Sequence, residues 1–94
     1  MRLGGVIWLR DTVDKIAFKH ALQTYEVEEV PRNNPKIRFV EKGERSGEDI
    51  YAAYGQTDAG RYVLVIFVQK KTNDALILSA RDMTGKERKR HGKK

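Results

Sequence analysis

The chain has 94 residues, a length that suits one hydrophobic core, so we expect a single domain over residues 1–94. Apolar residues make up 39% of the chain and charged residues 34%, which indicates a folded protein rather than a disordered one. The absence of cysteine excludes disulfides and cysteine-ligated metal sites, and two histidines are too few for a histidine-rich metal centre. No apolar run reaches the ~20 residues of a membrane helix, and residues 1–9 lack the apolar core of a signal peptide, so we expect a cytoplasmic protein.

The net charge of +6 is concentrated near the C-terminus. Residues 81–94 contain seven Lys and Arg against two acidic residues, so this segment carries +5 and residues 1–80 carry only +1. A basic block on a nearly neutral body indicates a nucleic-acid partner or an acidic protein partner, although a solvated tail has the same composition.

The N-terminal third predicts a short strand followed by two helices. Residues 6–9 form a β-branched and aromatic run that is typical of a strand. Apolar residues at helical spacing then predict a helix that is capped by Asp11 or Thr12 and ends near Ala21. A second, short helix starts at Thr24, with acidic residues in its first turns, where the helix dipole favours them.

The middle of the chain predicts strands. The proline-bounded segment 31–35 ends the helical region. Strands are then expected over residues 36–40, 49–54, 62–68 and 75–78, separated by polar or glycine-containing turns. The third of these is apolar on both faces, so we expect a central strand that is covered on both sides.

The last element is a basic helix over residues 85–91. Thr84 and Glu87 have the spacing of a capping box, and the helix lacks an apolar stripe, so we expect it to lie on the surface. This order of elements predicts a compact α+β domain: an antiparallel sheet with two N-terminal helices and a basic C-terminal helix, the helices lying on one face.

The sequence contains few of the motifs that carry enzyme chemistry. It has no glycine-rich phosphate loop, no serine nucleophile elbow and no acidic cluster with metal-ligand spacing. We therefore expect no cofactor and no metal. Histidine, carboxylate and arginine suffice, however, to cleave RNA through its own 2′-hydroxyl, which needs a base, an acid and cations that stabilise the transition state.

Five residues are candidates for this chemistry. His20 lies at the end of the first helix beside Lys19, where a histidine can also serve as a structural cap. Arg61 opens the central strand and Arg81 follows the last one, so both guanidinium groups could bind one phosphate or simply face solvent. Glu48 leads the preceding strand and could be a base or could orient an arginine.

Several segments in this order resemble toxins of the BrnT type over residues 7–91. They are Lys19-His20, the acidic stretch 26–30, Gly47-Glu48, the turn 53–58, Gly60-Arg61, Ile77-Leu78-Ser79-Ala80-Arg81 and Glu87-Arg88. In this family glycine usually follows Lys-His, whereas Ala21 stands here, so we expect no glycine cap at this helix end.

The resemblance implies a RelE-like fold and a ribonuclease that arrests translation until a ribbon-helix-helix antitoxin of the BrnA type neutralises it. By position it marks His20, Arg61 and Arg81 as the leading catalytic candidates, with Lys19 and Glu48 in support. His91 could act as an acid or could be a tail residue. The residues expected to hold the RNA backbone are Lys19, Lys86, Arg88, Lys89, Arg90 and His91.

Two functions remain open from the sequence. The first is a metal-independent endoribonuclease toxin whose site an acidic antitoxin segment covers, and which reaches operator DNA only indirectly, through that antitoxin. The second is a non-catalytic module that binds the antitoxin or a nucleic acid.

Overall fold

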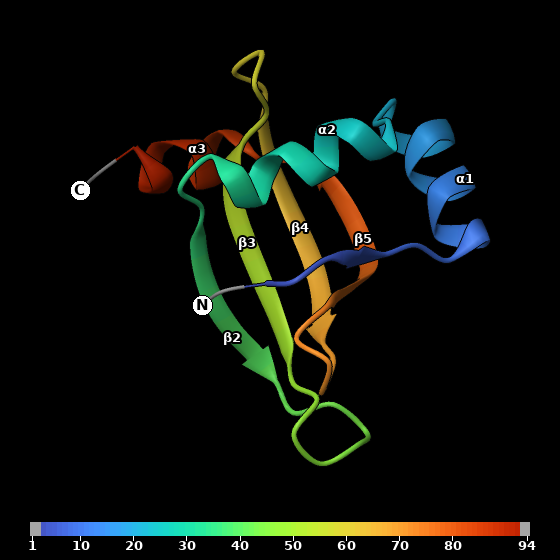
Figure 1. Cartoon of the computed structure of the whole chain (residues 1–94). Coiled ribbons are helices and arrows are strands. Elements are labelled where there is room, and N and C mark those ends of the chain that lie inside the picture. Colours follow the sequence, from blue (N-terminus) through green and yellow to red (C-terminus); the bar gives the residue numbers. More distant parts are fainter. Residues whose placement is uncertain (1–2, 93–94) are drawn as a thin grey trace.

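The computed structural model describes residues 3–92. In chain order the elements are β1 (Val6–Ile7), α1 (Arg10–His20), α2 (Thr24–Glu29), a 3-10 turn (Val30–Arg32), β2 (Lys36–Glu41), β3 (Ile50–Gln56), β4 (Tyr62–Gln69), β5 (Ala75–Asp82) and α3 (Gly85–His91). The five strands form one sheet in the order β1-β5-β4-β3-β2, with β4 at its centre (Figure 1). The α+β class and the order of elements that the sequence predicts are confirmed.

The sheet is mixed rather than wholly antiparallel, which corrects the expectation. The strands from β2 to β5 pair antiparallel, whereas β1 runs parallel to β5, with Val6 opposite Ala75. A hairpin imposes antiparallel pairing on its two strands, but β1 and β5 are separated by most of the chain, so no turn fixes their relative direction.

Several predicted boundaries also differ from the observed ones, among them the end of the second strand of the middle region, which lies at Gln56 and not at residue 54. The first helix begins at Arg10 after Leu9, whose side chain makes no cap, so neither Asp11 nor Thr12 is the N-cap; Asp11 lies instead in the first turn, where the dipole favours an acid. The last strand continues to Asp82, four residues beyond its predicted end.

One face of the sheet carries the main core. Alternate residues of β4 (Val63, Val65 and Phe67) point to this face, where they form one cluster with side chains of α1, α2 and the 3-10 turn. Each of these three side chains is at most 3% exposed. Burying an aliphatic or aromatic side chain of this size stabilises the fold by about 1.5–3 kcal/mol, so this face provides most of the hydrophobic stability.

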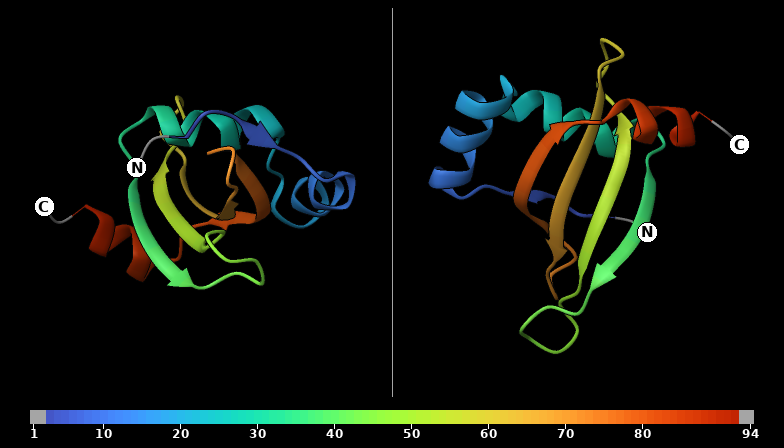
Figure 2. Two further views of the ribbon diagram at one scale, coloured as in Figure 1. Left: turned by 60° about the horizontal axis from the view of Figure 1, so that its bottom comes forward. Right: turned by 180° about the vertical axis from the view of Figure 1, so that it is seen from behind.

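The opposite face carries α3, which corrects the expectation that all helices share one face. Seen from behind, α3 crosses the end of the sheet, α2 passes behind the strands and α1 stands beside the β5 edge (Figure 2). A second, smaller apolar cluster of Ala52, Leu64 and Met83 lies on this face. None of the residues of α3 is buried, so its expected surface position is confirmed. Its capping box is confirmed as well, since the Thr84 hydroxyl accepts from the Glu87 amide at 3.1 Å.

A bulge in β5 decides which of its side chains reach which face. Ile66 of β4 lies opposite Ser79 and Phe67 lies opposite Ile77, so Leu78 is an extra residue in the ladder. After the bulge, Arg81 lies opposite Leu64 on the face of α3, and Asp82 faces the opposite side.

Candidate functional site: a cationic pocket beside helix α3

The guanidinium of Arg61 joins three elements on the core face. Its Nε and Nη2 donate to the two carboxylate oxygens of Asp82 at 2.6 and 3.0 Å, and Nη1 donates to Glu26 at 3.4 Å. Nη2 and Nη1 also donate to the backbone carbonyls of His20 and Ala21, at 2.7 and 3.0 Å. These bonds use all five N–H groups of the guanidinium. The Arg61 hydrogen bonds hold the pKa of Asp82 below its ordinary value, and the charge of His20 acts in the same direction.

The end of α1 forms a left-handed turn without glycine. Ala21 has φ 51° and ψ 38°, and the Leu22 amide donates to the Ile16 carbonyl at 3.2 Å, as in a glycine-terminated helix. The left-handed conformation costs a residue with a Cβ atom roughly 1–2 kcal/mol. The bonds from Arg61 to the carbonyls of residues 20 and 21 stabilise this strained end.

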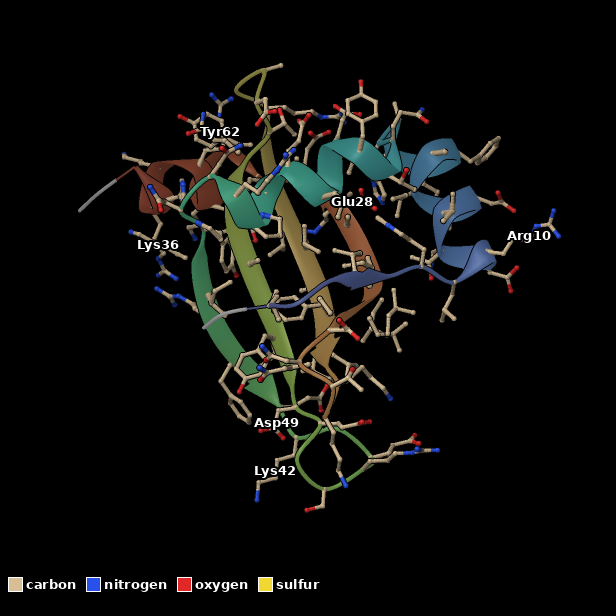
Figure 3. All side chains as sticks on the ribbon, in the orientation of Figure 1. Arg10, Glu28, Lys36, Lys42, Asp49 and Tyr62 are labelled. Atoms are coloured by element: carbon tan, nitrogen blue, oxygen red, sulfur yellow. The ribbon has the colours of Figure 1, made fainter. Side chains whose placement is uncertain are left out.

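Glu48 lies at the opposite end of the sheet. Its carboxylate is buried, accepts from Lys70 Nζ at 2.8 Å, and has a lowered pKa because of that hydrogen bond. The length of β3, about 20 Å, separates it from Arg61. In Figure 3 the neighbouring Asp49 lies at the far end of the sheet from Tyr62, which follows Arg61.

Arg81 lies on the other face and is paired with helix α3. Its Nη1 and Nη2 donate to the two carboxylate oxygens of Glu87 at 2.8 and 3.0 Å. Glu87 also caps α3, accepting from the Thr84 amide at 2.8 Å. Its pKa falls to about 2, mainly because of the bonds from Arg81. The four catalytic candidates are therefore not brought together: His20 and Arg61 share one face, Arg81 lies on the other, and Glu48 lies at the far end.

A pocket of about 350 Å³ lies between α3 and the sheet, on the face of Arg81. Its lining residues are Lys36, Arg38, Tyr54, Lys86, Glu87, Arg90 and His91. The pairing of the strands places Lys36, Tyr54, Leu64 and Arg81 in one row across the sheet. Figure 3 shows Lys36 at the end of the sheet where α3 lies. Among the described residues, no carboxylate forms an ion pair with Arg38, Lys86 or Arg90.

The predicted RNA-binding residues of α3 divide between this pocket and its outer side. Lys86, Arg90 and His91 line the pocket. Arg88 and Lys89 lie on the outer side, where the Arg88 guanidinium carbon stands 4.5 Å from the centre of the Tyr62 ring. Lys19 is exposed on α1, away from this group.

Sequence reasoning missed three pocket residues, Lys36, Arg38 and Tyr54. A signal for the first two was present, because residues i and i+2 of a strand share a face. No residue pattern near α3 indicated which face of the sheet the helix would cover. Lys36 and Arg38 line a pocket because α3 lies on their face.

Across residues 3–92, no three His, Cys, Asp or Glu side chains gather as the ligands of a metal would. None of the helices in this part of the chain has the length and apolar character that crossing a bilayer requires.

The mixed sheet, the helices on its two faces and the order of elements define an α+β fold that a solved ribonuclease toxin shares. A solved structure with this fold is the ribonuclease toxin BrnT of Brucella abortus, which matches with a TM-score of 0.64 over 85% of this chain and 96% of that chain. The two sequences are 18% identical, so the likeness establishes the shared fold. No protein-family model matches the sequence, and no curated protein does.

Proposed function

We propose that the chain is a metal-independent endoribonuclease toxin of a type II toxin–antitoxin module, which inhibits translation by cleaving RNA. The observation that carries the proposal is the pocket beside α3, where four cations surround a tyrosine and a histidine. The shared fold adds support, because the BrnT protein of Brucella abortus is described as a ribonuclease toxin.

The pocket supplies the groups that this reaction needs. Arg38, Lys86 and Arg90 would bind the phosphodiester and stabilise the negative charge that develops on phosphorus. Tyr54 offers a ring on which an unstacked base can lie, as is common in the recognition of single-stranded RNA. The nucleophile is the 2′-hydroxyl of the RNA itself, so the products would carry 2′,3′-cyclic phosphate and 5′-hydroxyl ends.

The other catalytic candidates stay predictions. Arg81 adjoins the pocket through Glu87, and a bound phosphate would compete with that carboxylate for its guanidinium. His20, Arg61 and Glu48 lie outside the pocket, and the bonds of Arg61 and Glu48 favour structural roles. A catalytic role for Arg61 would require its guanidinium to break the ion pair with Asp82.

The proposed partners come from the resemblance to BrnT toxins, and the charge of the pocket is compatible with them. An antitoxin of the BrnA type, with a ribbon-helix-helix DNA-binding domain, would neutralise the toxin by laying an acidic segment over the cations of the pocket. The chain would reach operator DNA only through this antitoxin.

The direct test is cleavage of a defined RNA by the purified chain in excess EDTA, beside the variants Arg81→Ala and Arg45→Ala. Arg45 is an exposed cation in the loop at the far end of the sheet, so it matches the loss of charge without touching the pocket. We expect cleavage in chelator, cyclic phosphate ends, loss of activity in Arg81→Ala and full activity in Arg45→Ala. Equal activity in the two variants would remove Arg81 from the site, and absence of cleavage by the unmodified chain would reject the function.

A non-catalytic binding module is the second candidate, and one observation favours it. Both arginines that the sequence marks as catalytic, Arg61 and Arg81, are bonded to carboxylates of the chain itself. The two functions differ in the cell: expression of the chain alone should arrest growth if it cleaves RNA, and should leave growth unchanged if it only binds.

A further inference from the structure

The side chain of His91 is partly enclosed although the residue lies at a helix end. His91 closes α3 and lines the cationic pocket. Its Nδ1 is shielded from solvent and has no hydrogen-bond partner in the described part of the chain. The ring packs edge-to-face against Tyr62, with 6.0 Å between the ring centres. Because Nδ1 is enclosed, Nε2 is the nitrogen left to exchange a proton with a molecule in the pocket.

The surroundings of His91 favour its neutral form. They contain cations from β2 and α3, phenols from β3 and β4, and one carboxylate: Lys36, Arg38, Lys86, Arg88, Arg90, Tyr54, Tyr62 and Glu87. This carboxylate, Glu87, already accepts hydrogen bonds from Arg81 and from the amide of Thr84. Burial lowers the pKa of His91, and the charge of Lys36 lowers it further. A neutral imidazole can accept a proton.

We infer that His91 is the general base of the pocket, which removes the proton from the attacking 2′-hydroxyl of RNA held by the surrounding cations. The inference rests on the proposed function and adds a residue and a role to it. The position of His91 among phosphate-binding cations matters here, because a bound phosphodiester brings the negative charge that stabilises an imidazolium.

The substrate, the imidazole and solvent water account for every bond and proton of the step. The 2′-oxygen forms a bond to phosphorus as its proton passes to Nε2 of His91, and the bond from phosphorus to the 5′-oxygen breaks. The leaving 5′-oxygen takes a proton from water, and the imidazolium later returns its proton to solvent. The products are a 2′,3′-cyclic phosphate and a 5′-hydroxyl, with no oxidant, reductant or metal consumed.

Substrate should therefore raise the pKa of His91. Proton NMR can follow this directly, since the chain has two histidines and the variant His20→Gln leaves only the His91 ring in the spectrum. The probe is a 2′-deoxy dinucleotide, which has the phosphodiester and lacks the nucleophile. We expect a pKa below the ordinary 6.5 in the free protein and an upward shift at saturating probe. An unchanged or lowered pKa in the bound protein would overturn the inference.

Kinetics give a second readout that a structural role would not move. His91→Ala should lower kcat by about 10²- to 10⁴-fold with little change in KM, the range for loss of a general base. Added imidazole should restore part of the activity of His91→Ala, with a pH dependence that follows free imidazole, and should not restore Arg38→Gln. Full activity of His91→Ala, or absence of rescue, would overturn the role of His91 while the unmodified chain still cleaves RNA. Absence of cleavage by the unmodified chain would instead reject the proposed function, and the base role with it.

Discussion

Arg61 and Asp82 form a two-bonded ion pair between the start of β4 and the end of β5, with N–O distances of 2.6 and 3.0 Å. The same guanidinium reaches Glu26 of α2 and the carbonyl of His20 at the end of α1. One side chain thereby fixes both N-terminal helices to the sheet. Its pairing leaves no N–H group for a phosphate, which distinguishes Arg61 from the cations of the pocket.

Replacing Arg61 should affect stability first. Arg61→Ala removes charge-assisted hydrogen bonds and leaves backbone carbonyls without donors, so we expect unfolding in urea to become easier by about 2–3 kcal/mol. Arg32→Ala is the matched control, because Arg32 contacts Asp58 at 3.9 Å with both side chains largely exposed, and such pairs contribute about 0–1 kcal/mol. A variant Arg61→Ala that keeps full stability and loses RNA cleavage would support the catalytic role instead.

Glycine at position 21 should stabilise the protein. Ala21 has φ 51°, a conformation that glycine adopts without strain, so Ala21→Gly should raise the free energy of unfolding by about 0.5–1 kcal/mol. Ala59→Gly serves as the control, since Ala59 is also exposed but does not have a positive φ. There glycine should be neutral or slightly destabilising, because it only adds freedom to the unfolded chain. Thermal unfolding of the two variants side by side tests this, and a lower midpoint for Ala21→Gly would contradict it.

The ion pair of Arg81 and Glu87 should make the free energy of unfolding depend on pH. The folded-state pKa of Glu87, about 2, lies below the ordinary 4.5, so the carboxylate stabilises the fold above pH 4.5 and loses this contribution as the pH falls towards 2. Urea unfolding of the unmodified chain and of Glu87→Gln should show a clear difference at pH 7 that shrinks steadily between pH 5 and pH 2. Other carboxylates titrate in both proteins and cancel in the comparison. A difference that does not change with pH would exclude this ionic contribution.

The pocket cations should determine how RNA binding responds to salt. Each phosphate contact to single-stranded nucleic acid adds about 0.7 to the slope of log K against log salt concentration, so Arg38→Gln should lower the slope by about that amount. Fluorescence anisotropy with a labelled, non-cleavable oligonucleotide over a range of KCl concentrations measures the slope. Arg45→Gln, at the opposite end of the sheet, should leave it unchanged. Equal slopes for the two variants would place the binding surface outside the pocket.

Local signals in the sequence predicted most elements correctly. The capping box of Thr84 and Glu87 places α3 at residues 85–91, as observed, because both partners lie within one turn. The apolar residues 62–68 predicted a central strand covered on both faces, and β4 has Val63 on the core face and Leu64 on the other. These features depend on neighbours within a few residues, which a sequence displays directly.

The missed features depend on contacts between distant parts of the chain. The pocket forms because β2 pairs with β3 and because α3 packs on the face of the sheet opposite the main core. The residues of a single element determine neither arrangement. The catalytic candidates illustrate the same limit. Arg61 precedes β4 and Arg81 lies near the end of β5, yet the sequence does not reveal that Asp82 and Glu87 pair with them.

The bulge that leaves Leu78 outside the β4–β5 ladder keeps Arg81 and Asp82 on their present faces of the sheet. With strict alternation from Ile77 onward, Arg81 would point among the apolar side chains under α1 and α2, and Asp82 would point towards α3. If Leu78 took a regular position in the ladder instead of forming a bulge, an acid and a base would therefore exchange faces, whereas deleting Leu78 would leave both on their present faces. The pairing of Asp82 with Arg61 and the position of Arg81 beside the pocket therefore both depend on the bulge at Leu78.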